Sequence, residues 1–329
     1  MKAGKLPPHV LEGLLEKIPG HDPRLIIGAR LGEDAAVINF SGDFGERYLV
    51  AKTDPITFAA ERIGWYAVHI NANDVATLGA RPRWFLAALL LPAAELAQPI
   101  LADILAACAE LGVSLCGGHT ELTAGLERPI VVGQMLGEVS KDHLVRKENI
   151  RPGDAILLTK GLAIEGTAIL AREKAEALRG PLRSQAALER ARNFLFDPGI
   201  SVVAEALAAV EAAPGGVHGM HDPTEGGLVG GLYELAAAAG CGLRVERAAI
   251  PVLPETQAVC GALGLDPLRL IASGALLIAV APEAAAAVSA RTGAVRIGEV
   301  RPAAEGLRLD SEALTFPEED EIARGLAGP

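Results

Sequence analysis

The sequence is poor in aromatic residues, which make up 4% of its 329 residues. Base stacking on aromatic side chains is a main device for holding single-stranded nucleic acid, so a broad stacking surface is not expected. The chain also lacks a run of lysine and arginine, because its richest segment, 146–151, is short and is interrupted by Glu148. Since the formal net charge is −11, the protein should repel nucleic acid.

Cysteines are few, and no two of them form a Cys-x-x-Cys pair. This spacing disfavours a zinc site or a redox pair, so we expect free thiols in a reducing cytosol. Uninterrupted apolar runs of membrane-spanning length are also missing, and the first residues contain no apolar signal core. We therefore expect a cytoplasmic protein that does not enter a membrane. The four cysteines are Cys108, Cys116, Cys241 and Cys260.

Apolar residues are abundant, at 50% of the sequence, and the length is sufficient for two domains. The turn cluster at 151–154 indicates a boundary, which predicts domains of 1–150 and 151–329. Strand and helix patterns alternate on both sides of it, so we expect two α/β domains. The expected helices are 6–18, 62–78, 95–111, 165–178 and 227–239, and the expected strands are 35–40, 48–52, 84–91, 113–116, 130–139, 155–159, 276–280 and 295–300.

Three aspartates in the first half stand next to predicted core segments. Asp34 precedes a strand, Asp54 follows one, and Asp74 lies on an otherwise apolar helix. Carboxylates among core residues are costly unless a cation neutralises them, and Mg²⁺ prefers oxygen ligands. The alternatives are that Asp34 and Asp54 are turn or cap residues and that Asp74 is a solvated helix position.

The segment Gly117-Gly118-His119-Thr120 is expected to close a strand. Two glycines allow a close backbone approach, and their N–H groups could hold a phosphate, although a simple turn has the same composition. The segment is not a Walker loop, because no Gly-Lys-Ser/Thr follows it.

The segment 222–227, Asp-Pro-Thr-Glu-Gly-Gly, is expected to open a helix in the second half. A helix N-terminus can hold an anion, and the alternative is a capped helix start with Thr224 or Asp222 as N-cap. His218 and His221 have metal-ligand spacing, but no third ligand is evident from the sequence.

Five segments together, in this order along the chain, resemble the motifs of the PurM-like superfamily, which contains aminoimidazole-ribonucleotide synthetase, thiamine-monophosphate kinase, selenophosphate synthetase and HypE. The most specific is 73–80, Asn-Asp-Val-Ala-Thr-Leu-Gly-Ala. The segments are 32–36, 53–54, 73–82, 117–120 and 222–227.

The resemblance implies an α/β (α+β) fold with two PurM-like domains. The N-terminal domain would pair strands across a homodimer, and ATP and Mg²⁺ would be the cofactors. Asp34, Asp54 and Asp74 match the family's metal ligands, and Asp222 and Thr224 match residues that reach the phosphate end. The implied nucleotide contacts are Gly32, Thr53, Asn73, Gly117, Gly118, Thr120, Arg146 or Lys147, and Thr224.

Two departures from the family narrow the choice. His119 stands where kinase-like members have Asp and the purine enzyme has Glu, so Glu121 is the substitute metal ligand that we expect. HypE carries its reactive group on a C-terminal cysteine, whereas the last cysteine here is Cys260, so the HypE reaction is not expected to run unchanged. The pattern favours a branch near HypE and thiamine-monophosphate kinase, in which the loop 160–167 resembles the substrate loop.

The resemblance predicts ATP-dependent phosphoryl transfer to an oxygen of a small carbonyl, amide or phosphate substrate, or dehydration through that phosphorylation. Asp222, Glu225 and His119 are the candidate bases. The alternative is a non-catalytic ATP-binding maturation or regulatory module that acts through a protein partner.

Overall fold

The computed structural model describes residues 8–9, 12, 24–27, 31–41, 46–57, 61–182 and 184–327. The chain divides into two compact units. The N-terminal unit consists mainly of Asp34–Leu144, joined by Gly20–Ala29, and the C-terminal unit consists mainly of Val145–Pro329, joined by Arg30–Glu33. The helix expected over 6–18 lies almost entirely outside the described residues.

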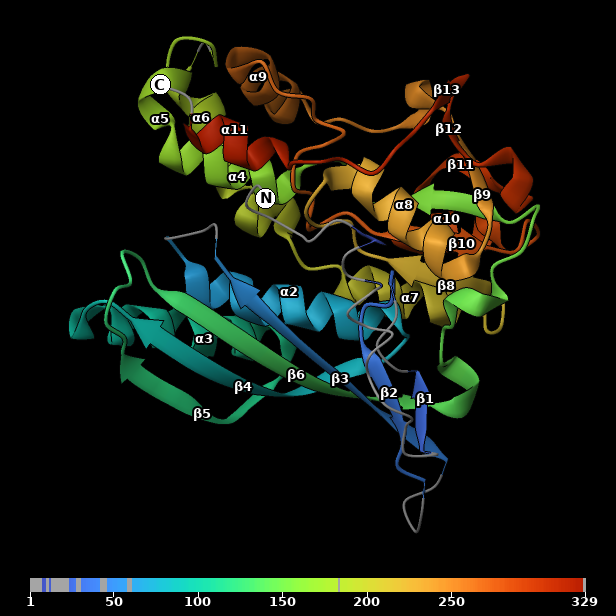
Figure 1. Ribbon diagram of the computed structural model, residues 1–329, viewed down its shortest axis with the longest axis horizontal. Coiled ribbons are helices and arrows are strands. Elements are labelled where there is room, and N and C mark those ends of the chain that lie inside the picture. The colour runs from blue at the N-terminus through green and yellow to red at the C-terminus, as the bar shows by residue number, and fades with distance from the viewer. Residues whose placement is uncertain are drawn as a thin grey trace. The chain divides into compact units, whose positions relative to one another are not determined.

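The N-terminal unit is built on a six-stranded sheet with the strand order β1-β2-β3-β6-β4-β5, and β5 lies at its edge (Figure 1). Only the pair β4–β5 is parallel. Helices α2 (Ile63–Thr77) and α3 (Ala97–Leu111) pack against the sheet and each other. The strands are β1 (Leu25–Ile27), β2 (Ala36–Asn39), β3 (Arg47–Ile56), β4 (Arg81–Leu91), β5 (Ser114–Leu122) and β6 (Ile130–Ser140).

Helix α2 is buried along its whole length, which explains why its sequence is apolar on all sides. Strand β4 was expected to be buried on both faces, but only alternate residues such as Phe85 and Leu89 are buried. Leu86, Ala88 and Leu90 are half-buried on the other face. Within one chain, therefore, only the face of β4 that packs against the helices is fully buried.

The C-terminal unit contains a seven-stranded sheet with the order β13-β12-β9-β11-β7-β10-β8. Its central strands β7 (Ala155–Leu158) and β10 (Leu277–Val280) are fully buried, so the core lies on both sides of the sheet. The other strands are β8 (Val217–His221), β9 (Gly242–Val245), β11 (Val295–Arg301), β12 (Leu307–Leu309) and β13 (Glu312–Ala313). The helices are α4 (Ile164–Glu173), α5 (Ala175–Leu178), α6 (Gln185–Asn193), α7 (Val203–Ala212), α8 (Gly227–Ala239), α9 (Pro254–Leu263), α10 (Ala285–Thr292) and α11 (Glu321–Ala327).

The expected mixed α/β class is confirmed, and α8 has the predicted bounds. The helix expected over 165–178 is interrupted at Lys174, which separates α4 from α5. Within the described residues, no single helix has both the length and the apolar character of a membrane span. The helical segments Gln185–Asn193 and Leu195–Ala212 meet these criteria only together, as a pair bent by 42°.

Candidate functional site

Three carboxylates of the N-terminal unit gather around one lysine. Lys52 Nζ lies 3.0 Å from a carboxylate oxygen of Asp74 and 3.4 Å from one of Asp54. The third carboxylate, Asp34, accepts a hydrogen bond of 3.1 Å from the Thr77 hydroxyl. The fold brings these residues together in three ways. Lys52 and Asp54 are two residues apart on β3 and therefore lie on the same face of the sheet. Asp74 and Thr77 are about one helical turn apart on α2, and Asp34 lies just before β2.

The charged groups of this set, which we call the acid cluster, shift one another's pKa. Burial raises the pKa of Asp74 above its usual range, and the charges of Asp34 and Asp54 raise it further, although Lys52 opposes them. Burial alone would lower the pKa of Lys52, but attraction by Asp74 and Asp54 outweighs it and raises that pKa. We therefore take the lysine as permanently charged, with three carboxylates around it. Such a cluster fits a divalent cation, which carboxylates ligate.

Asp74 is not the solvated helix residue of the simpler alternative, because its exposed fraction is 5%. Sequence reasoning missed Lys52, although one signal could have found it: the lysine is two residues from Asp54 on the same strand and therefore on the same face. Hydrogen bonds also tie α2 to β3, since the Asn71 side-chain amide donates to the Asp54 carbonyl at 3.2 Å. Asn73 is fully buried on the same helix.

The glycine pair lies inside β5 and does not end a strand, which corrects the expected position. The ladder between β4 and β5 shifts register once, between Phe85 and Leu86, and then continues to Leu122. Gly118, with φ of +152°, approaches β4 so closely that a Cβ would lie 2.0 Å from the Ala87 carbonyl oxygen. Gly118 thus permits the pairing of β5 with β4, which explains why the strand continues past the glycine pair.

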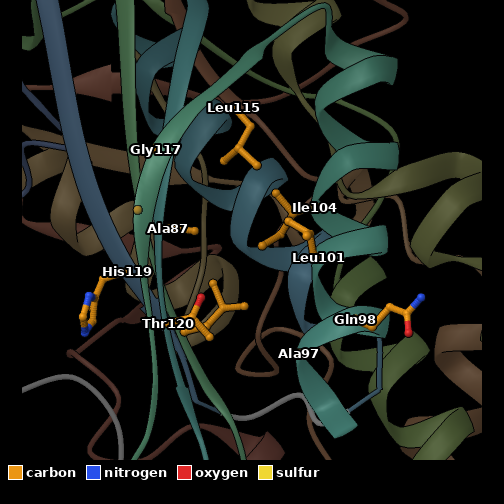
Figure 2. A pocket seen from close by; sticks show the side chains of 11 residues that line it. Ala87, Ala97, Gln98, Leu101, Ile104, Leu115, Gly117, His119 and Thr120 are labelled. Atoms are coloured by element: carbon orange, nitrogen blue, oxygen red, sulfur yellow. The ribbon is translucent and has the colours of Figure 1, made fainter. Parts of the chain in front are cut away.

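A cavity of about 440 Å³ lies between β4, β5 and α3. Figure 2 shows the Thr120 side chain on the same side of β5 as Leu101 and Ile104 of α3, whereas His119 points to the other side. His119 Nε2 is 3.2 Å from a carboxylate oxygen of Glu121, and both side chains are exposed. Neither residue is therefore part of the core.

Within one chain, the sheet separates these residues from the acid cluster. Asp54 pairs with Gly133, Gly133 with Ala87, and Ala87 with Gly118, so one row of the sheet joins Asp54 to Gly118 across four strands. At about 4.8 Å per strand, the separation is about 14 Å. Gly117, Thr120 and Glu121 lie on the same distant strand. Thr53, also on β3, donates its hydroxyl to the Gly133 carbonyl at 2.8 Å.

The segment 222–227 links β8 to α8 in the C-terminal unit. Helix α8 is capped by Gly226, with φ of +80° and no side-chain cap, so the alternative of Thr224 or Asp222 as N-cap is wrong. Asp320 accepts a hydrogen bond of 2.5 Å from the Gly226 N–H, and the Thr224 carbonyl accepts one of 3.3 Å from Ala272. Asp222 is 1% exposed, and Glu225 is half-buried.

The two histidines of β8 contact different carboxylates. His218 Nδ1 is 2.8 Å from Asp154, and His221 Nε2 is 3.0 Å from Glu234 of α8. Because each histidine contacts its own carboxylate, the His-x-x-His spacing does not bring the two rings together as ligands of one metal ion.

The two basic residues at 146 and 147 differ in their surroundings. Arg146 is half-buried and pairs with Glu148 at 2.8 Å. Lys147 is 1% exposed, and its Nζ donates to the Gly32 carbonyl at 2.5 Å.

The loop 160–167 combines strained backbone with a buried acid. Lys160 and Ala163 have positive φ values of 53° and 52°, which is uncommon for residues other than glycine. Glu165 is 3% exposed, and burial raises its pKa to about 8, with the charge of Glu225 adding to the effect. Strain of this kind concentrates at functional sites.

Both domains of one family match the chain. The AIR synthase related protein N-terminal domain matches residues 32–139, and the C-terminal domain matches residues 151–309. The carbamoyl dehydratase HypE of Cupriavidus necator is 34% identical over 288 residues, which cover 82% of this chain and 77% of that protein. HypE of Rhizobium leguminosarum bv. viciae is 31% identical over 315 residues, which cover 90% and 81%.

Solved structures show the same fold. HypE in complex with ATP has a TM-score of 0.69 at 26% identity and covers 92% of each chain. AaThiL complexed with AMPPCP and TMP has a TM-score of 0.73 at 18% identity and covers 94% of each chain, a likeness of fold. The expected family is confirmed, and the chain belongs to the AIR synthase related protein family, in which HypE proteins are among its relatives.

Proposed function

We propose that this chain is an ATP- and Mg²⁺-dependent enzyme that activates the oxygen of a small carbonyl or amide substrate by phosphorylation. The observation that carries the proposal is the acid cluster, in which three carboxylates of the family motifs converge around one lysine, in a family with an ATP-bound member. HypE relatives are carbamoyl dehydratases, so an amide or carbamoyl group is the favoured acceptor.

In this proposal Asp34, Asp54 and Asp74 hold Mg²⁺, which would neutralise charge on the transferred phosphoryl group. Lys52 keeps the three carboxylates in place when the cation is absent, because it pairs with two of them. Nucleotide contacts are assigned to the backbone at Gly32, Gly117 and Gly118, to the side chains of Thr53, Asn73, Thr120 and Thr224, and to Arg146. Glu121 stays a candidate metal ligand that a partner subunit would have to bring to the cluster.

The chemistry on an amide balances as a dehydration. The amide oxygen attacks the γ-phosphorus, the bond to the β–γ bridging oxygen breaks, and ADP leaves. The oxygen then departs with inorganic phosphate as the nitrogen loses its two protons, which leaves a nitrile. Asp222, Glu225 and His119 are the candidate bases for those protons; Asp222 and Glu225 belong to the C-terminal unit, and His119 to the N-terminal unit.

We also propose that the protein is a homodimer. The face of β4 opposite the helices carries half-buried Leu86, Ala88 and Leu90, and Trp84 is 37% exposed beside them. Such an apolar surface is typical of an interface. A protein partner is a second proposal, because a structural relative occurs as a HypE–HypF complex.

Titration of ATP by calorimetry, with and without Mg²⁺, tests the proposed function. The wild-type protein should bind ATP more tightly with Mg²⁺, and Asp54→Asn should lose that dependence while its circular dichroism spectrum stays unchanged. Asp142→Asn, which removes an exposed carboxylate of the same unit, is the matched control and should bind as the wild type does. ATP binding that ignores Mg²⁺, or that survives Asp54→Asn intact, would refute the assignment of the acid cluster.

The acceptor is sought afterwards, by following ADP and phosphate release with ³¹P NMR across carbamates, amides and carbonyl compounds. Stoichiometric loss of the amide oxygen as phosphate, traced with ¹⁸O, is the expected result. Transfer of ¹⁸O to water would exclude phosphorylation of that oxygen.

A further inference from the structure

Three side chains of the C-terminal unit form a buried chain of hydrogen bonds. Lys147, His221 and Glu234 are 1%, 4% and 7% exposed. Lys147 Nζ lies 3.3 Å from His221 Nδ1, and His221 Nε2 lies 3.0 Å from Glu234 Oε2. We call these three residues the lysine relay. They come from separate elements, since Lys147 begins the short 3₁₀ helix η3 (Lys147–Asn149), His221 ends β8, and Glu234 lies on α8.

The chemistry of the donors fixes the direction of these hydrogen bonds. A lysine ammonium has only donors, so His221 Nδ1 must be the acceptor. The ring proton is then on Nε2, from which it is donated to the Glu234 carboxylate. Hence the relay carries a cation at one end, an anion at the other and a neutral imidazole between them, and buried charges compensated in this way are tolerated.

The ammonium also holds the backbone of a motif. Lys147 Nζ also donates a hydrogen bond of 2.5 Å to the Gly32 carbonyl. Helix α8 also confines the same glycine, because a Cβ on Gly32 would lie 2.3 Å from the Glu234 carbonyl oxygen, and the φ of Gly32 is +78°. Gly32 is thus fixed between Lys147 and the helix that carries the far end of the relay.

Gly32 and Lys147 each lie, along the chain, within a few residues of a described position where the chain passes from one unit to the other. The chain leaves the C-terminal unit after Glu33 and returns to it at Val145. Gly32 precedes the first crossing by one residue, and Lys147 follows the second by two. Asp34 of the acid cluster is the first residue beyond Gly32 and Glu33, and Asp222 directly follows His221.

We infer that Lys147 is a positioning residue that acts through Gly32 and His221, and that it does not contact a nucleotide phosphate. It fixes the backbone that leads into Asp34 and the end of β8 that leads into Asp222, and Glu234 is required for this through His221. The inference rests on the proposed function for its consequence, because the two aspartates so positioned are the candidate metal ligand and the candidate base.

The structural part of the inference is tested without nucleotide. In wild-type protein labelled with ¹⁵N-histidine, His221 should show a protonated Nε2 and an accepting Nδ1, and Lys147→Met should change the Nδ1 shift. Hydrogen exchange of residues 31–36 should be faster in Lys147→Met and in Glu234→Met than in wild type. Lys141→Met removes an exposed lysine and should leave this exchange unchanged. An Nδ1-protonated His221, or unchanged exchange at 31–36, would overturn the inference whether or not the protein binds ATP.

The functional part is tested by a double-mutant cycle on the dissociation constant of Mg²⁺-ATP. Lys147→Met and Glu234→Met should each weaken binding about tenfold, and the double variant should weaken it no further, because residues of one network are not additive. The milder Glu234→Gln, which keeps an acceptor for His221, should weaken binding less and guards against loss of folding in Glu234→Met. A tenfold effect of Lys147→Met with wild-type binding by Glu234→Met would instead identify Lys147 as a direct phosphate contact. Absence of ATP binding by the wild type would refute the proposed function and leave the exchange and NMR results to decide on the relay.

Discussion

The buried Glu165 makes stability depend on pH in a direction that can be worked out. Burial raises its pKa to about 8 from the ordinary value of 4.5, with Glu225 and Asp320 adding to the shift and Ser273 opposing it. Between these values the folded chain binds a proton that the unfolded chain has already lost. The free energy of unfolding therefore falls as pH rises through this window. From pH 5.5 to pH 8.5 the loss amounts to about 3 kcal/mol.

Glu165→Gln has the shape of the neutral acid and cannot ionise, so it should abolish this dependence. Urea unfolding of the variant and the wild type, followed by circular dichroism at pH 5.5 and pH 8.5, gives their free energies of unfolding at each pH. In the difference between the two proteins, the contributions of most other titrating groups cancel. From pH 5.5 to pH 8.5, we expect the free energy of unfolding of the variant to rise by about 3 kcal/mol relative to that of the wild type. Glu283→Gln, at an exposed position, is the control. A difference that does not change with pH would refute the reasoning.

Three further predictions concern single side chains. Lys52→Met should destabilise the N-terminal unit by about 3 kcal/mol, because it removes the cation that pairs with Asp74 and Asp54. Added Mg²⁺ should restore part of this stability in thermal melts, and no response to Mg²⁺ would contradict a cation site. Gly118→Ala should cost more than about 3 kcal/mol of stability or prevent folding, since its Cβ would lie 2.0 Å from the Ala87 carbonyl oxygen. Gly112→Ala is the control: its Cβ would meet open space, and the φ of +65° alone should cost about 1 kcal/mol. Tryptophan fluorescence during urea unfolding compares the stability of the two variants. His218→Ala should lower the free energy of unfolding by about 3 kcal/mol, because it removes the imidazole that lies 2.8 Å from the Asp154 carboxylate. Adding Asp154→Asn to this variant should restore part of the stability, because it removes the negative charge of the buried carboxylate.

The sequence predicted elements best where helix-breaking residues mark their ends. The helix over 62–78 was expected to stop at Gly79 and Pro82, and its observed bounds, Ile63–Thr77, differ from the prediction by one residue at each end. Strand β5 was predicted to end at Cys116 because two glycines follow it. Its continuation to Leu122 depends on pairing with β4, a tertiary contact that local composition does not record.

Motif residues could be recognised from the sequence, but their side-chain directions could not. Asp34, Asp54 and Asp74 do converge, although Asp54 was expected to follow a strand and instead lies within β3, which continues to Ile56. Glu121 was expected to join them, yet in one chain it lies on an exposed strand at the sheet edge. That outcome depends on the strand order, in which β6 and β4 separate β3 from β5, and no local pattern specifies strand order.

Lys147 shows the same limit for a charged residue. A basic residue near a phosphate motif suggests a phosphate contact, because most lysines are exposed and long enough to reach a ligand. Here the fold instead buries the ammonium between a glycine carbonyl and a histidine, so its charge is compensated by Glu234 through His221. In the acid cluster, three carboxylates lie around one lysine, and carboxylates are ligands that a divalent cation takes. The partners of a charged residue, and not its presence alone, therefore separate the proposed binding site from the proposed positioning network.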